Sequence, residues 1–144
     1  MVHINRTFTV DKPRREVFEY LRDFANAEEW DPGTVSCTRI GTGPVGLGST
    51  WHNVSKVLGK ETALTYELTR QEPDHLQFTG KNKTATSTDD IGLAEGERPG
   101  TTTITYDSNI ELHGPAALGA PIMKVAFEKI GTDTEESLKQ VFSR

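Results

Sequence analysis

The sequence predicts an α+β fold: a curved antiparallel β-sheet of about seven strands around a long C-terminal α-helix, with two short helices after the first strand. Three observations predict it. Apolar and polar residues alternate through most of the chain, as they do in strands with one buried face. The residues after Pro115 instead place apolar side chains at helical spacing. The 144-residue chain also contains 19 threonines, which suit a pleated surface with one wet face. Successive strands with segregated helices indicate α+β rather than a parallel βαβ fold.

The first strand and the two short helices are predicted within residues 2–30. Residues 2–10 alternate between apolar and polar side chains and form the strand. Asp11 and Pro13 then begin a helix, because Asp suits the cap and Pro the first turn. One apolar stripe follows at helical spacing, made by Val17, Tyr20, Leu21 and Phe24. A second short helix is expected over residues 24–30, before the turn sequence Asp31-Pro32-Gly33.

The remaining strands and the long helix follow. Alternation predicts strands over residues 34–40, 49–58, 60–71, 76–81, 84–93 and 101–113. The buried stripe of the long helix is predicted to consist of Leu118, Ile122, Val125, Ala126, Lys129, Ile130, Leu138, Val141 and Phe142. Pro121 is expected to start or kink this helix, and Gly131 to weaken its middle.

Charge and cysteine content exclude several classes of function. The net charge is −5, from 16 basic and 21 acidic residues mixed along the chain. The only basic groupings are Arg14-Arg15 and the loop pair Lys81 and Lys83. A nucleic-acid surface needs more concentrated positive charge, so no nucleic-acid partner is expected. Cys37 is the only cysteine, so one chain cannot form a disulfide.

Length and hydropathy predict the number of domains and the cellular location of the protein. A chain of 144 residues has the size of one domain, which we expect to span residues 1–144. The N-terminus lacks the basic-then-apolar layout of a signal peptide, and no apolar run reaches the ~18 residues of a membrane span. We therefore expect a soluble, cytoplasmic protein without stable membrane insertion, either a monomer or a weak homodimer.

Four segments carry a resemblance to a known superfamily. They are Val10–Asp23, Glu29–Gly33, Gly46–Trp51 and Leu118–Pro121. In these segments the chain resembles the START-like or Bet v1-like (SRPBCC) superfamily, and within it the polyketide cyclase/dehydrase and lipid-transport family. The resemblance spans essentially the whole chain and implies a helix-grip fold, with a cavity between the concave sheet face and the C-terminal helix. It implies no particular catalytic residue, because no catalytic motif matches position by position.

The inner face of the sheet supplies the candidate ligand-binding residues. Seven sheet side chains are expected to point inward, where two side chains of the long helix meet them: Trp51, Asn53, Tyr66, Phe78, Asn82, Tyr106, Ser108, Met123 and Phe127. Apolar walls with a few polar groups are the usual composition of a ligand site. In such a pocket Tyr66 and Tyr106 would donate hydrogen bonds to a ligand carbonyl. The alternative is an ordinary aromatic core, in which buried tyrosines bond to the backbone.

Two charged residues leave alternatives open. Arg6 shares its face with Ile4 and Phe8. It either points into the cavity, where it would bind a carboxylate or polarise a ketone, or reaches water or an acidic partner at the strand end. Asp89 shares its face with Ile91 and would be that partner or a base. A bulge would turn Asp89 outward, and we favour the outward orientation.

No cofactor and no metal site is expected. The histidines fall on outward positions without ligand spacing: His3, His52, His75 and His113. No Ser-His-Asp or Cys-His arrangement can be placed either. Gly41–Gly46 matches G-x-G-x-x-G, but a strand follows it and Pro44 lacks an amide donor. We therefore prefer a glycine-rich hairpin at the cavity rim to a dinucleotide site. Asp31 is expected to form a turn rather than to act as an acid catalyst.

Three functions follow from these observations. The primary prediction is the binding of a small hydrophobic ligand, such as a lipid, a polyketide or a polycyclic compound. The second is a polyketide aromatase/cyclase-dehydratase, which would close a poly-β-ketone by acid–base catalysis with Tyr66, Tyr106, Arg6 or Asp89. The third is a protein-interaction module, for which an outer-face change such as Glu67→Lys would matter more than changes in the cavity.

Overall fold

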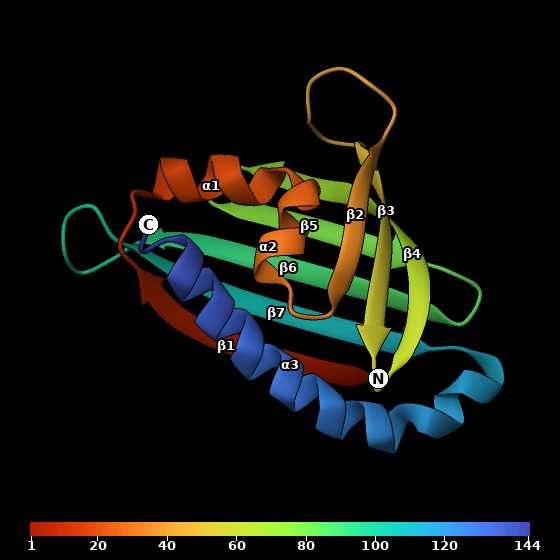
Figure 1. The fold of residues 1–144 in the computed structure, drawn as a ribbon. Coiled ribbons are helices and arrows are strands. Elements are labelled where there is room, and N and C mark those ends of the chain that lie inside the picture. The colour runs from red at the N-terminus through yellow and green to blue at the C-terminus, as the bar shows by residue number, and fades with distance from the viewer.

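Seven strands form one antiparallel sheet in the computed structural model, which describes residues 1–144 (Figure 1). They lie in the order β1-β7-β6-β5-β4-β3-β2, so the first strand pairs with the last. Their bounds are β1 Val2–Val10, β2 Thr34–Ile40, β3 Thr50–Val57, β4 Lys60–Glu72, β5 His75–Lys81, β6 Ala85–Glu95 and β7 Thr102–Leu112. Each strand begins and ends within a residue or two of a predicted one, and the predicted α+β fold is confirmed.

The helices lie where the sequence predicts them. They are α1 Arg14–Arg22, the 3-10 helix η1 Phe24–Asn26, α2 Ala27–Trp30, the 3-10 helix η2 Gly114–Gly119, and α3 Ala120–Val141. The predicted second short helix is thus η1 followed by α2. The Asp23 side chain caps η1 by accepting a hydrogen bond from the backbone N–H of Ala25 over 3.1 Å. Pro121 lies in the first turn of α3, where its missing N–H would have no partner in the helix anyway.

The helices cover different parts of the sheet. η1 and α2 contact β2, whereas α3 lies along β1 (Figure 1). Gly131 lies where α3 crosses β1, and a Cβ at this position would stand only 2.6 Å from Cγ2 of Ile4. The glycine that was expected only to weaken the helix therefore also permits its close approach to the sheet.

An aromatic cluster fills the part of the concave face beneath the short helices. The ring centroid of Phe24 lies 4.5 Å from that of Phe78 and 4.6 Å from that of Tyr66. Trp51 is fully buried beside Phe24 and Phe78, and its Nε1 donates a hydrogen bond to Asp23. Trp51 thus buries its large apolar ring while its indole N–H keeps a hydrogen-bond partner. The aromatic cluster does not fill the part of the concave face that α3 covers, and a cavity lies there.

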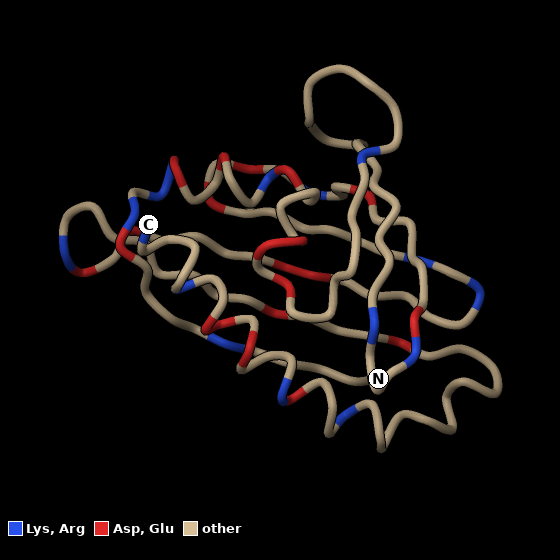
Figure 2. Tube along the Cα trace, viewed as in Figure 1, with Lys and Arg blue, Asp and Glu red and all other residues tan.

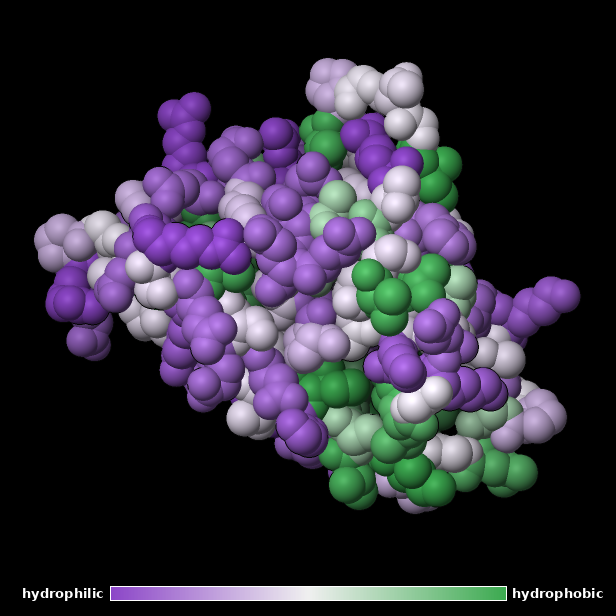
Figure 3. Space-filling model, in the orientation of Figure 1, coloured by the Kyte–Doolittle hydropathy of each residue, from purple (hydrophilic) through white to green (hydrophobic).

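The predicted buried stripe of α3 is wrong at its N-terminal end. Leu118 in η2, Ile122 and Val125 are 86%, 64% and 74% exposed. Figure 3 shows hydrophobic residues gathered on the surface over η2 and the first turns of α3. The inner face of these turns is formed by Met123 and Phe127 instead. Both sets have helical spacing, so periodicity alone does not choose between them. The C-terminal part of the stripe is buried as predicted, at Leu138, Val141 and Phe142.

The charged residues show no large region of one sign. Figure 2 shows basic and acidic residues interspersed along both α1 and α3. None of the helices combines the length and the apolar character that crossing a membrane requires.

Candidate functional site

A cavity of about 210 Å³ lies between α3 and the inner face of the sheet. Twenty residues line it, and half of them are hydrophobic. The hydrophobic ones are Val57, Leu64, Tyr66, Ala85, Tyr106, Ile110, Leu112, Met123, Phe127 and Ile130. A mostly apolar wall with convergent polar groups is typical of a small-molecule site. The volume lies below the ~300–1,000 Å³ of most such sites, so the cavity suits a compact molecule.

Six of the nine predicted ligand-binding residues line this cavity: Tyr66, Asn82, Tyr106, Ser108, Met123 and Phe127. The other three, Trp51, Asn53 and Phe78, are buried but do not line it. Trp51 and Phe78 belong to the aromatic cluster under the short helices. Asn53 donates a hydrogen bond from Nδ2 to Oγ1 of Thr34 over 3.1 Å. These three residues therefore lie in the protein core, which was the alternative to a place in the cavity wall.

Two polar side chains of the wall also organise turns. Asp31 accepts hydrogen bonds from the backbone N–H of Gly33 over 3.0 Å and from Oγ1 of Thr34 over 2.9 Å. Asn82 accepts one from the backbone N–H of Thr84 over 2.8 Å. Asp31 thus forms the turn that the sequence predicts, but it also lines the cavity, which the sequence did not indicate. Burial raises the pKa of the Asp31 carboxyl.

Asp89 forms the centre of a buried polar cluster in the cavity wall. It is only 6% exposed, and its Oδ1 accepts a hydrogen bond from Ser108 Oγ over 2.6 Å and one from the Tyr106 hydroxyl over 3.3 Å. Strand pairing creates this arrangement, because Asp89 on β6 lies opposite Ser108 on β7, and Ile91 lies opposite Tyr106. The other oxygen, Oδ2, has no hydrogen-bond partner in the chain. Since Asp89 lines the cavity, this oxygen is available to a bound molecule.

The environment of the cluster shifts its protonation. Burial raises the pKa of Asp89 to about 7, and the negative charge of Asp31 contributes to the rise. Burial and then the charge of Asp89 raise the pKa values of Tyr66 and Tyr106 well above the usual one. Near neutral pH, Asp89 is therefore present in both its protonated and its ionised form, while both tyrosines keep their protons.

The outward orientation favoured for Asp89 is wrong. The ladders of β6 with β5 and with β7 contain no register shift, so its alternation is unbroken. The irregularities that shift register occur in the pairing of β2 with β3 and of β4 with β5 instead. The alternation of Ala85, Ser87, Asp89 and Ile91 is the sequence signal that identifies Asp89 and Ser87 as inward residues, and both of these line the cavity.

Arg6 contacts α3 and is not part of the cavity wall. Its Nη2 donates hydrogen bonds to the backbone carbonyl of Glu128 over 3.1 Å and to the carboxylate of Glu128 over 3.2 Å. Of the alternatives left open for Arg6, the acidic partner is the one found. No group of three or more His, Cys, Asp or Glu side chains comes together in a way that could hold a metal ion.

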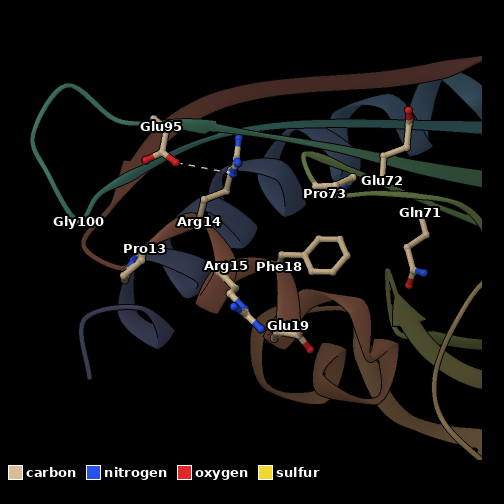
Figure 4. Close-up of a pocket in the computed structure, with 10 residues that line it drawn as sticks. All are labelled: Pro13, Arg14, Arg15, Phe18, Glu19, Gln71, Glu72, Pro73, Glu95 and Gly100. Carbon is tan, nitrogen blue, oxygen red and sulfur yellow. Dashed lines mark ion pairs between the residues drawn. The ribbon is translucent and has the colours of Figure 1, made fainter.

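Two other features are weaker candidates for a ligand site. An open groove of about 580 Å³ beside α1 has Phe18 as its only hydrophobic wall residue, and Arg14 Nε lies 3.8 Å from Glu95 Oε1 across it (Figure 4). The loop containing Gly41–Gly46 joins β2 to β3, as the hairpin interpretation predicts. It extends away from α3 in Figure 1, and none of its residues lines the cavity. Its predicted position at the cavity rim is therefore wrong.

A curved antiparallel sheet that encloses a cavity with a C-terminal helix defines a helix-grip protein, the class formed by START-like and Bet v1-like domains. More narrowly, the chain belongs to the family described as polyketide cyclase/dehydrase and lipid transport, whose model matches residues 1–143. The resemblance carried by the four sequence segments is therefore confirmed.

Solved structures share this fold at low sequence identity. A START superfamily protein from Mycobacterium smegmatis has a TM-score of 0.80 and 13% identity, with 98% of this chain and 97% of that chain covered. The Zhui aromatase/cyclase from Streptomyces sp. R1128 has a TM-score of 0.80 and 13% identity, with 99% and 93% covered. The di-domain ARO/CYC BexL has a TM-score of 0.67 and 16% identity, with 99% and 51% covered. At these identities the similarity shows the fold alone. No curated protein matches the sequence.

Proposed function

We propose that the chain binds one small, largely apolar molecule in the cavity between α3 and the sheet, with a polar group of that molecule at Asp89. The observation that carries the proposal is the buried Asp89 carboxyl, whose Oδ2 has no partner in the chain and which lines a cavity with ten hydrophobic wall residues. A ligand donor that bonds to this oxygen gains a charge-assisted hydrogen bond when Asp89 is ionised, which is about twice as strong as a neutral one. Membership of a family described in part as lipid transport supports the proposal.

The size of the cavity limits the ligand class. A volume of about 210 Å³ suits a compact apolar molecule, or the compact part of a larger one, better than a whole long-chain lipid. A polyketide fragment or a small ring system would fit this description. The hydrophobic side chains of α3 would contact its apolar part, while Ser108 and Tyr106 hold Asp89 in place.

Native mass spectrometry of freshly purified protein tests the proposal. We expect an excess mass bound one-to-one, which denaturing extraction releases for identification. Ser87→Phe fills the cavity from β6 and should abolish the excess mass. Thr88→Phe places the same ring on the opposite face of that strand and should retain it. Circular dichroism of both variants verifies folding. An unliganded mass that persists across a panel of short-chain amphiphiles, quinones and polyphenols would contradict the proposal.

A reaction on the bound molecule is the second candidate function. Asp89 favours it, because a pKa of about 7 is suited to proton transfer near neutral pH, and the Tyr106 hydroxyl is bonded to it. An aromatase/cyclase would use such groups to promote ring closure and dehydration of a poly-β-ketone. The test is conversion of a short poly-β-ketone mimic, followed by product analysis. Asp89→Asn should abolish turnover while binding of the mimic remains measurable, whereas equal turnover in the variant would contradict an acid–base role.

A further inference from the structure

We infer that the polar group of the ligand is a protonated amine and that the cavity discriminates against carboxylates. This inference rests on the proposed ligand-binding function. The charged residues of the wall are Asp31, Asp89 and Lys60. Asp89 is buried and Asp31 partly so, whereas Lys60 is exposed where β4 begins. The interior of the cavity therefore contains two carboxyls without a buried cation beside them.

The surrounding elements do not supply the missing positive charge. α3 contributes Met123, Phe127 and Ile130 to the wall, all of them uncharged. Arg6 faces the same helix, but its guanidinium is bound to the carbonyl and carboxylate of Glu128. No arginine or histidine lines the cavity. Above the pKa of Asp89, a cation that neutralises its carboxylate therefore has to come with the ligand.

The geometry of Asp89 specifies where this cation would bind. Two donors from β7, Ser108 and Tyr106, occupy Oδ1 and hold the carboxyl in one orientation. Oδ2 has no donor, although a buried carboxylate is stable only when it is paired and hydrogen-bonded. An ammonium group offers both a charge and N–H donors, and charge-assisted hydrogen bonds are about twice as strong as neutral ones. The rings of Tyr66 and Tyr106 line the same wall, and aromatic rings attract cations.

Other polar groups satisfy this site less completely. A ligand hydroxyl can donate to Oδ2 but leaves the charge of Asp89 uncompensated. A ligand carboxylate adds a third negative group to the two that Asp31 and Asp89 already bring to the cavity. For one common apolar body, the expected order of affinity is therefore amine, then alcohol, then carboxylate.

The pH dependence of binding gives a readout on the unmodified protein. The titratable groups that share the cavity with Asp89 are Tyr106 of β7, Tyr66 of β4, Asp31 after α2 and Lys60 at the rim, and α3 and β5 contribute none. Burial raises the pKa of Asp89 to about 7, so the charged form that attracts an amine is lost below this pH. Affinity for an amine should fall as the pH falls through about 7, while affinity for an alcohol should change little.

The experiment compares n-octylamine, n-octanol and n-octanoate, which share one apolar chain, by isothermal titration calorimetry on the full chain. At about pH 8, above the pKa of Asp89, octylamine should bind on the order of tenfold more tightly than octanol, and octanoate most weakly. Asp89→Asn should remove the preference for octylamine, so that octylamine and octanol bind with equal affinity. The matched control is Asp90→Asn, on the outer face of the same strand beside His75, which should alter none of the three affinities.

The outcomes separate this inference from the proposed function. Octanoate or octanol binding as tightly as octylamine overturns the inference and leaves the proposed function standing. An octylamine preference that survives Asp89→Asn, or that is independent of pH in the unmodified protein, also overturns it. Failure of all three probes to bind, together with an unliganded native mass, overturns both.

Discussion

The ring of Tyr66 lies over Gly80, its partner across the β4–β5 ladder. A Cβ at position 80 would stand 2.6 Å from Cε1 and Cζ of this ring, closer than any van der Waals contact allows. The ring of Phe24 lies 4.6 Å from that of Tyr66, between centroids, and restricts its movement. The absence of a side chain at Gly80 therefore sets the position of one wall of the cavity.

Gly80→Ala should displace Tyr66 and destabilise the protein by about 1–3 kcal/mol, the usual cost of overpacking a well-packed site. The added methyl group has no space unless the ring moves into the cavity or against Phe24. Urea unfolding measures the stability, and titration with a bound probe measures the accompanying loss of affinity. Gly92→Ala is the control, because its Cβ would lie 3.8 Å from the nearest atom, on Thr105. Equal stability of the two variants would contradict the predicted clash.

Asp89→Asn should stabilise the ligand-free protein at high pH and not at low pH. Burial raises the pKa of Asp89 from 3.8 to about 7, so the folded state retains a proton that the unfolded state releases. The contribution of Asp89 to the free energy of unfolding therefore falls as the pH rises from about 4 to about 7. An amide can accept the same two hydrogen bonds without this loss, so the variant should gain on the order of 4 kcal/mol at about pH 8.

Urea unfolding of both proteins across this pH range measures the difference. Asp90→Asn is the control, because Asp90 is the next residue on β6 and lies on its outer face beside His75. A stability difference for Asp89→Asn that is the same at all pH values would show that Asp89 does not titrate in the cavity.

The exposed side chains at the start of α3 should contribute little to stability. Ile122 and Val125 are 64% and 74% exposed, so replacing both by Gln should change the free energy of unfolding by about 0.5 kcal/mol or less per site. Leu138 lies on the same helix and is 1% exposed, and Leu138→Ala should cost about 2–5 kcal/mol. Thermal and urea unfolding compare the three proteins. A large loss in the Ile122→Gln/Val125→Gln variant would show that the predicted stripe is buried after all.

Local alternation was sufficient to predict the strands and the inward side of most of them. Trp51, Tyr66 and Tyr106 are all buried on the predicted face, because a period of two fixes the face wherever the ladder is unbroken. Which inward residues line a cavity depends on distant parts of the chain. Phe24 from η1 contacts the rings of both Trp51 and Tyr66, yet only Tyr66 lines the cavity. No pattern within a strand encodes this difference.

Helical periodicity was insufficient for α3 for a related reason. Ile122 and Val125 are three residues apart and Met123 and Phe127 four apart, both helical spacings, and both pairs were expected to face inward. Only the position of the helix over the sheet shows which pair does. Asp89 was misassigned because a bulge was expected to turn it outward, and β6 contains no bulge. The unbroken ladder places its carboxyl inward instead, opposite Ser108.

Gly131→Ala should destabilise the protein although alanine favours helices over glycine by about 1 kcal/mol. The new Cβ would lie 2.6 Å from Cγ2 of Ile4 and 3.3 Å from Nη2 of Arg6, so α3 would have to move away from β1. We expect a net loss of about 1–3 kcal/mol in urea unfolding. Ile4→Ala removes the clashing atoms, so Gly131→Ala should cost less in that background than in the unmodified chain. Equal costs in both backgrounds would mean that contact with Ile4 is not what requires glycine at this crossing.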